Sequence, residues 1–274
     1  MSMCNGISPN RQEYLRKTRV RKIIIRTCQC AVLFFTIFLW EATARLGIID
    51  SFIMSQPSRI LRTVANFQNN NLLHHIGITF LETIIGFTLG AIIGIFIAFL
   101  LWRSTFLAKV ADPYLVVINA LPKIALGPVI IIWVGAGMQA VIVMALAISL
   151  VVTIMEMLNG FKNTDAELIK MARTFGASRL QTFFKIVFPY NLPTLFSCLK
   201  INIGLSLVGV IAGEFLVSRA GLGYLIVYGG QVFQMDLVMT SVIILAVLAA
   251  LLYWLVGLIE WAVMRVVNKK EAYK

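Results

Sequence analysis

The chain has 274 residues, of which 59% are hydrophobic and 13% are charged. Soluble domains carry charge on about a quarter of their residues, so this composition excludes a soluble domain. The mean hydropathy is +0.89, and several apolar stretches reach the roughly 20 residues that a helix needs to cross a bilayer. We therefore expect an all-α protein embedded in membrane lipid.

The formal net charge of +12 could in principle indicate a nucleic-acid partner. The basic residues, however, lie beside the apolar stretches, where membrane topology accounts for them. No soluble segment interleaves aromatic and basic residues, so we expect no nucleic acid to bind.

No group of residues resembles an enzyme site. His74 and His75 have no ligand-forming neighbour at the right spacing, and Cys28 and Cys30 lack the two further ligands that a zinc site needs. The four cysteines give no disulfide framework. The sequence has no Gly-x-x-x-x-Gly-Lys-Ser/Thr loop, so it cannot hydrolyse ATP by that route. We expect no catalytic residue, no metal and no cofactor in this chain.

The first 26 residues contain seven Lys or Arg and lead into an apolar stretch from about Ile23 to Ala44. This pattern resembles a signal peptide, but no small-residue cleavage site follows. We therefore predict a basic tail over residues 1–22 and an uncleaved transmembrane helix with an external loop over residues 23–74. A short surface helix is possible from Ser58 to Phe67.

Five more apolar stretches lie in a core membrane domain over residues 75–267, followed by a short tail over residues 268–274. In the first of them, Gly86, Gly90 and Gly94 recur every four residues, which lets another helix approach closely. Pro122 and Pro128 are expected to break the second. The predicted spans are about His75–Trp102, Pro113–Trp133, Met138–Leu158, Leu192–Val217 and Leu237–Val267.

The positions of the basic residues predict the orientation of these about six spans. With a cytoplasmic N-terminus, the cytoplasmic segments are residues 1–26, 103–112, 156–190 and 265–274. They hold 18 of the 24 Lys and Arg residues, whereas the two long external loops hold four. Because cytoplasmic loops carry an excess of Lys and Arg, this count predicts that both termini are cytoplasmic.

The segment over residues 160–190 carries charge and two sets of helix boundary signals. Thr164 and Glu167 have the spacing of a capping box, which predicts the start of a short helix. Gly176 can end that helix in the left-handed conformation, with Ala177 completing a tight turn.

A second short helix is predicted directly after this turn. Ser178 and Gln181 repeat the capping box, and Pro189 is expected to stop the helix because it lacks an N–H group. The apolar face of the first helix could lie in the lipid headgroup layer or dock on a soluble partner, and the residues alone leave both open. That face consists of Leu168, Ile169, Ala172 and Phe175.

Polar residues inside predicted spans are costly, so each is a candidate functional residue. Lys123 follows Pro122 in the broken span, where its ammonium could attract an anionic solute. Alternatively it pairs with Glu82 or Glu214 and orients helices, which is the more common arrangement and the one we prefer. We expect Lys200 and Glu260 to reach the interface. The remaining candidates are Asn119 and Asn202.

The charged segment resembles the cytoplasmic loop signature of ABC-importer permeases, which reads Glu-Ala-Ala, three residues, Gly, nine residues, Ile-x-Leu-Pro. Here Lys170 and Met171 stand in place of the Glu and the first Ala, and Phe188 in place of Leu. The resemblance implies a coupling helix that sits in a cleft of an ATP-hydrolysing subunit. The residues it assigns to this loop are Glu167, Lys170, Met171, Ala172, Gly176, Ala177, Ile186 and Pro189.

Residues 75–265 are similar to the nitrate/sulfonate/taurine subfamily of these permeases. The resemblance is carried by residues 112–133, by Gly213-Glu214-Phe215 and by residues 221–226. It implies the type I importer (MetI-like) fold in a bacterial cell membrane. It also implies a second permease copy, two ATPase subunits that use ATP-Mg, and an extracytoplasmic substrate-binding protein.

The leading hypothesis is therefore the permease subunit of an ATP-driven importer, with a translocation path that involves Asn119, Pro122, Lys123 and Glu214. The subfamily favours a small anion such as an aliphatic sulfonate, taurine or nitrate as cargo. A thiamine-precursor pyrimidine or a riboflavin-like heterocycle is the alternative within the same machinery. An ion-coupled secondary transporter, with Glu82 and Glu214 as a relay, is the alternative from another class.

Overall fold

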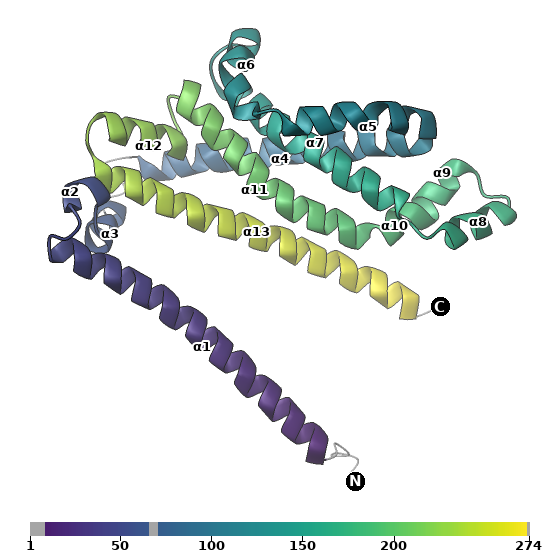
Figure 1. The fold of residues 1–274 in the computed structure, drawn as a ribbon, viewed down its shortest axis with the longest axis horizontal. Coiled ribbons are helices and arrows are strands. Elements are labelled where there is room, and N and C mark those ends of the chain that lie inside the picture. The colour runs from purple at the N-terminus through teal and green to yellow at the C-terminus, as the bar shows by residue number, and fades with distance from the viewer. Residues whose placement is uncertain (1–8, 66–70, 273–274) are drawn as a thin grey trace. The chain divides into compact units, whose positions relative to one another are not determined.

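The computed structural model describes residues 9–65 and 71–272, and all regular elements in these ranges are helices (Figure 1). The chain divides into two compact units, residues 1–65 and 66–274. Five described helices are long and apolar enough to cross a membrane, or six if one bent pair counts as a single span. The expectation of an all-α membrane protein with about six spans is confirmed.

The first unit contains one long helix and two short ones, α1 (Pro9–Arg45), α2 (Ser51–Met54) and α3 (Pro57–Ala65). Residues 23–45 of α1 form its membrane-spanning part. The Glu41 carboxylate accepts hydrogen bonds from Arg45 Nε at 2.7 Å and from the Ser58 amide at 3.1 Å, which ties α3 to the end of α1. The predicted surface helix is therefore present as α3, while Phe67 lies outside the described residues.

The second unit is built around three long helices that pack on one another and on a fourth (Figure 1). Shorter helices lie between them or at their ends. The long helices are α4 (Leu72–Arg103), α7 (Met138–Lys162), α11 (Leu192–Val217) and α13 (Met235–Ala272). The shorter ones are α5 (Thr105–Ala120), η1 (Lys123–Leu126), α6 (Gly127–Val134), α8 (Ala166–Thr174), α9 (Arg179–Thr182), the π-helical turn η2 (Phe183–Val187), α10 (Phe188–Tyr190) and α12 (Leu222–Gln231).

Small residues let α4 and α7 approach each other closely. A Cβ atom built on Gly86 would lie 2.7 Å from the Ala145 Cβ, and one on Gly94 would lie 2.6 Å from the Thr153 Cβ. Such separations are shorter than van der Waals contact, so only glycine fits there. The predicted glycine stripe on α4 is thus a helix-packing surface.

Helix α7 makes a similar contact with α11 on its other side. A Cβ on Gly209 would lie 2.5 Å from the Ala145 Cα, and one on Gly213 would lie 2.9 Å from the Val141 Cα. Val141 and Ala145 are fully buried. Helix α7 is therefore enclosed between glycine-containing faces of two neighbours.

The predicted third span is strongly bent. Helix α5 and the segment η1–α6 meet at an angle of 84° at Leu121 and Pro122. Pro122 marks the break as expected, because it lacks an N–H group. The expectation for Pro128 is wrong, since this residue lies in the first turn of α6, where a missing N–H costs nothing.

Helix α12 lies in a segment for which the sequence predicts only an external loop. It packs on α13 and α11, and Leu222 and Leu225 are buried in the largest apolar cluster of the unit. The polar and glycine residues of this segment gave no strong helical periodicity, so the helix was not anticipated.

The glycine contacts predict a clear difference between two substitutions in α4. Gly94→Ala should lower the free energy of unfolding by about 1–3 kcal/mol, because the new methyl group overlaps Thr153. Gly77→Ala is the matched control, since nothing lies within 4 Å of a Cβ at that position. Thermal unfolding in detergent measures both variants, and equal shifts in Tm would contradict the packing role.

Candidate functional site

One candidate site is the hairpin formed by α8, α9, η2 and α10, at one end of the long helices (Figure 1). Gly176 has a φ of +77° and ends α8 as predicted. The Ser178 hydroxyl accepts from the Gln181 amide at 3.2 Å, and the Gln181 side chain accepts from the Ser178 amide at 2.8 Å. The second capping box is therefore confirmed.

The start of α8 differs from the prediction. Asp165, and not Thr164, is the N-cap residue, and its carboxylate accepts from the Glu167 amide at 2.8 Å. The Thr164 hydroxyl instead accepts a hydrogen bond from Asn191 Nδ2 at 2.8 Å. The Thr164 hydroxyl, which the local spacing predicted to cap α8, is therefore bonded to Asn191, 27 residues further along the chain.

The end of the hairpin differs as well. The prediction that Pro189 stops the second helix is wrong, because helical structure continues through η2 and α10 to Tyr190. In η2 the Phe188 amide donates to the Phe183 carbonyl, five residues back. Pro189 follows this wider turn and lies in the first turn of α10. Backbone N–H groups in the first turn of a helix have no acceptor within the helix, so the missing N–H of the proline breaks no hydrogen bond there.

The inner side of the hairpin is fixed to the ends of α4 and α7 by an aromatic cluster. The Phe183 ring is 3% exposed, and its centroid lies 4.5 Å from that of Phe99, 5.1 Å from Trp102 and 5.1 Å from Phe161. Val187 is fully buried beside this cluster. The hairpin is therefore held rigidly on the helix bundle.

The hairpin also exposes large apolar side chains. The Phe175 side chain is 83% exposed, although apolar groups of this size are normally buried. The other residues of the predicted apolar face are less exposed than Phe175. Ala172 is buried, and Leu168 and Ile169 are partly buried. We call the exposed set the hairpin surface, and it comprises Met171, Phe175, Leu180 and Phe184.

The remaining predicted coupling residues also lie in the hairpin segment. Glu167, Lys170 and Pro189 are exposed, whereas Ala177 and Ile186 are partly buried. Leu180 and Phe184 were not anticipated. Phe183 is buried, whereas the adjacent Phe184 is exposed. Successive residues of a helix point in different directions, so two neighbouring phenylalanines are a sequence signal that one of them is exposed.

A second group of polar residues lies at the opposite end of the long helices. Glu82 of α4 and Glu214 of α11 are 2% and 1% exposed. Thr79, which bonds Glu214, lies three residues before Glu82 on α4, so the two buried carboxyl groups belong to the same region of the bundle. The sequence named these two residues as a possible relay of an ion-coupled transporter, but the role of Thr79 was not predicted.

Glu214 connects three helices through its hydrogen bonds. It accepts from the Thr79 hydroxyl at 2.6 Å and from the Gly223 amide at 2.5 Å, at the start of α12. Thr79 in turn accepts from the Leu222 amide at 2.8 Å. A Cβ on Gly221 would overlap the Glu214 carboxyl group, so only a glycine at position 221 lets the backbone lie this close to Glu214. Glu214 therefore fixes the first turn of α12 to α4 and α11.

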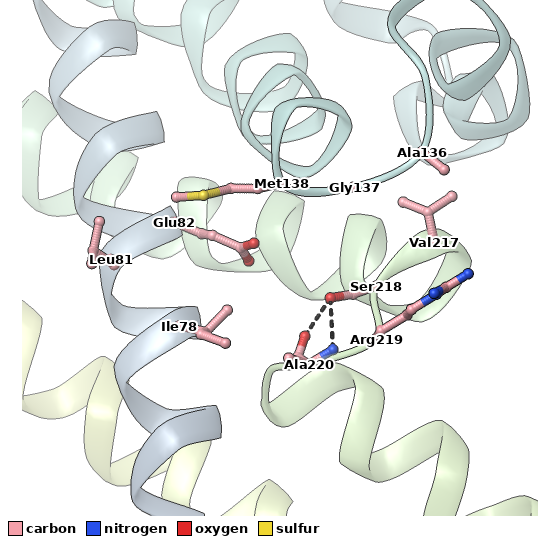
Figure 2. Close-up of a pocket in the computed structure, with 10 residues that line it drawn as sticks. All are labelled: Ile78, Leu81, Glu82, Ala136, Gly137, Met138, Val217, Ser218, Arg219 and Ala220. Atoms are coloured by element: carbon pink, nitrogen blue, oxygen red, sulfur yellow. Dashed lines mark hydrogen bonds between the residues drawn. The ribbon is translucent and has the colours of Figure 1, made fainter.

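Glu82 also lines a cleft of about 450 Å³ at this end (Figure 2). Two loops contribute to its wall, one through Ala136 and Gly137 and the other through Ser218, Arg219 and Ala220. Figure 2 shows the Glu82 carboxyl group between them, and its Oε2 atom has no hydrogen-bond partner among the described residues.

The structure separates Lys123 from the carboxylates it was expected to pair with. The Lys123 ammonium donates to the Asn119 carbonyl at 3.1 Å and to Asn119 Oδ1 at 3.3 Å, on the bend between α5 and η1. Asn119 and Pro122 are exposed and Lys123 is partly buried. The preferred pairing of Lys123 with Glu82 or Glu214 is therefore wrong among the described residues, since Lys123 bonds Asn119 while Glu214 bonds Thr79 and Gly223.

Lys200 and Glu260 form an ion pair between α11 and α13. That both side chains reach the interface stays a prediction, and the ion pair leaves each side chain about a quarter exposed. Asn202, one turn from Cys198 on α11, donates to its sulfur at 3.1 Å, so it is part of the buried helix packing.

Comparison with protein families matches residues 90–270 to the binding-protein-dependent transport system inner membrane component. A probable ABC transporter permease protein of Haemophilus influenzae is 31% identical, over 83% of this chain and 94% of that protein. A putative aliphatic sulfonates transport permease protein of Bacillus subtilis is 27% identical over 86% of both chains. The riboflavin transport system permease protein of Chloroflexus aurantiacus is 30% identical, over 85% of this chain and 87% of that protein.

Among solved structures, the methionine ABC transporter MetNI in an inward-facing conformation has a chain with a TM-score of 0.64. The two chains are 21% identical, and the match covers 70% of this chain and 95% of the other. This likeness concerns the fold, and it confirms the type I importer arrangement of helices that the sequence motifs implied.

The Glu214 contacts predict a stability difference between two threonines of α4. Thr79→Val should lower the free energy of unfolding by about 1–3 kcal/mol, because it leaves the Leu222 amide and a Glu214 oxygen without their partner. Thr83→Val is the control, since this hydroxyl bonds only the Thr79 carbonyl within the same helix. Thermal unfolding in detergent compares them, and a smaller loss for Thr79→Val than for Thr83→Val would contradict the role of Glu214.

Proposed function

We propose that this chain, which belongs to the family of binding-protein-dependent transport system inner membrane components and is an ABC importer permease, couples ATP hydrolysis to import through its hairpin surface. The observation that carries this proposal is the exposure of Phe175 on a hairpin whose opposite side is packed against the bundle. Exposed apolar groups on a rigid element are typical of a docking surface for another protein.

In this proposal the partner is an ATPase subunit, present in two copies, that binds ATP-Mg. This chain would contribute no ATPase site of its own. Burying one phenylalanine side chain contributes about 1.5–3 kcal/mol, so the four residues of the hairpin surface can supply much of the energy of a specific contact. Because the aromatic cluster around Phe183 fixes the hairpin to α4 and α7, movement of the ATPase would be transmitted to these helices.

The distribution of Lys and Arg supports a cytoplasmic hairpin and cytoplasmic termini in a bacterial cell membrane. Glu82 and Glu214 would then lie near the external face, where the proposed substrate-binding protein docks. The orientation therefore assigns the two ends of the bundle to two different partners.

We further propose that two copies of this chain enclose the translocation path. Ile132 and Trp133 of α6 are 81% and 80% exposed, and the adjoining bend carries the polar residues Asn119 and Lys123. A polar group beside an exposed apolar face suits a path bounded by a second copy better than it suits lipid alone. Asn119, Pro122 and Lys123 are our candidate path residues, while Glu214 is enclosed within the bundle.

For the cargo we favour a small anion such as an aliphatic sulfonate, taurine or nitrate. The Lys123 ammonium has no carboxylate partner among the described residues, so its charge is available to an anion. The riboflavin permease among the relatives supports the alternative of a neutral heterocycle, such as riboflavin or a thiamine-precursor pyrimidine. An ion-coupled secondary transporter would use the Glu82–Glu214 pair, but the hairpin surface would then have no purpose.

The hairpin surface predicts that Phe175→Ala weakens binding of the ATPase subunit by about 2 kcal/mol, or about thirtyfold in Kd, as expected for a central aromatic residue of an interface. Phe106→Ala is the matched control, because Phe106 is 73% exposed and lies outside the hairpin. Binding of the purified permease to its ATPase in detergent, together with ATPase activity in proteoliposomes, measures the effect. Equal affinity of the two variants would refute the coupling role.

The path proposal predicts that Lys123→Gln lowers uptake of an anionic cargo by about tenfold, which corresponds to about 1.4 kcal/mol for a lost charge interaction. Assembly with the ATPase should be unchanged. The control is Lys109→Gln, an exposed lysine of α5 away from the bend. Uptake of radiolabelled taurine, nitrate and riboflavin by proteoliposomes would decide the cargo class, and undiminished anion uptake by Lys123→Gln would exclude the lysine from the path.

A further inference from the structure

A small pocket of about 170 Å³ lies between the end of α4, the start of α5 and the hairpin. Its wall contains three arginines, one at the end of α4, one in the last turn of α8 and one at the start of α9. These are Arg103, Arg173 and Arg179. Ile169 and Trp102 supply apolar surface beside them.

No acidic partner for the three guanidinium groups lies in the part of the chain that the structure describes. In the ranges 9–65 and 71–272, no carboxylate forms an ion pair with Arg103, Arg173 or Arg179. Arg179 Nη1 donates to the Arg103 carbonyl at 3.0 Å, which brings the two segments together and increases the local positive charge. Three like charges in one pocket repel one another, so an anion would be bound favourably.

Part of the pocket wall is fixed by packing, whereas the three arginine residues are exposed. The Trp102 ring packs on Phe183 at 5.1 Å, within the aromatic cluster that holds the hairpin. Thr182, also in the wall, is 3% exposed, and its hydroxyl bonds the Ser178 carbonyl at 3.0 Å. The planar guanidinium fork matches the oxygens of a phosphate group.

The depth of the pocket points to lipid as the source of that phosphate. Arg103 is the last residue of α4 and Thr105 the first of α5, so the pocket lies where two membrane-spanning segments reach the interface. Tryptophan is enriched at this level, and basic pockets between helix ends on the cytoplasmic side recognise anionic headgroups. The hairpin surface, which we assign to the ATPase, consists of other residues.

We propose that this pocket binds the phosphate group of an anionic phospholipid. The assignment to the cytoplasmic leaflet rests on the orientation given under the proposed function, whereas the binding itself does not. The bound lipid joins Arg103 at the end of α4 to Arg173 and Arg179 of the hairpin. It thereby neutralises their repulsion and holds the hairpin against the bundle.

Native mass spectrometry of the detergent-solubilised chain, after exchange into phosphatidylglycerol or phosphatidylcholine, tests this proposal. The wild-type chain should retain phosphatidylglycerol and not phosphatidylcholine. Arg173→Gln should weaken retention about fivefold, as expected for one basic residue near an anionic lipid. Arg173 is exposed and forms no side-chain hydrogen bond or ion pair with the described residues, so its replacement leaves packing intact.

The matched control is Lys170→Gln, which removes one exposed charge from the same helix outside the pocket. Arg103→Gln is the second pocket variant, and it should behave like Arg173→Gln. Equal retention by pocket and control variants, or equal loss in both, would overturn the proposal. Displacement of the lipid by inorganic phosphate at similar concentration would overturn the lipid assignment in favour of a soluble phosphate ligand. These readouts require neither transport nor an ATPase, so they fail independently of the proposed function.

Discussion

Helix α7 can occupy the centre of the bundle only because its neighbours present glycine to it. Gly86 and Gly94 of α4 face it on one side, and Gly209 and Gly213 of α11 face it on the other. In a membrane the burial of apolar surface gives little drive for helix association, so close van der Waals packing has to provide it. The positions of both functional ends of the bundle depend on this contact, since each end is built from the termini of the same three helices.

The two ends are constructed in different ways. At one end, aromatic side chains around Phe183 hold the hairpin, and apolar packing leaves its outer residues free for a partner. At the other end, buried hydrogen bonds from Thr79 and Gly223 to Glu214 hold α12. Directional bonds of this kind fix one geometry, and breaking one leaves a polar group unsatisfied at considerable cost.

Local sequence signals predicted the features that depend on local chemistry. The capping box at Ser178, the left-handed Gly176 and the glycine stripe of α4 are each determined by residues within about one or two helical turns. The spans were predictable because a helix must satisfy its backbone within lipid.

Features that depend on distant residues could not be predicted in this way. Thr164 has the chemistry of an N-cap, but Asn191 takes its hydroxyl and Asp165 becomes the cap. Glu82 was available to pair with Lys123 by charge alone, yet the fold buries Glu82 on α4, close in sequence to the Thr79 that bonds Glu214, and leaves Lys123 bonded to Asn119. Helix α12 likewise begins where Glu214 and Thr79 bind its first amides, which no short window of sequence reveals.

Helix α11 follows the hairpin after only one non-helical residue, Asn191, which is itself bonded to Thr164. Its far end carries Glu214, bonded to α4 and α12. Each residue advances an α-helix by about 1.5 Å and turns it by about 100°. A single inserted or deleted residue within Leu192–Glu214 would therefore rotate the carboxyl group away from Thr79, so the number of residues in this helix is as constrained as their identity.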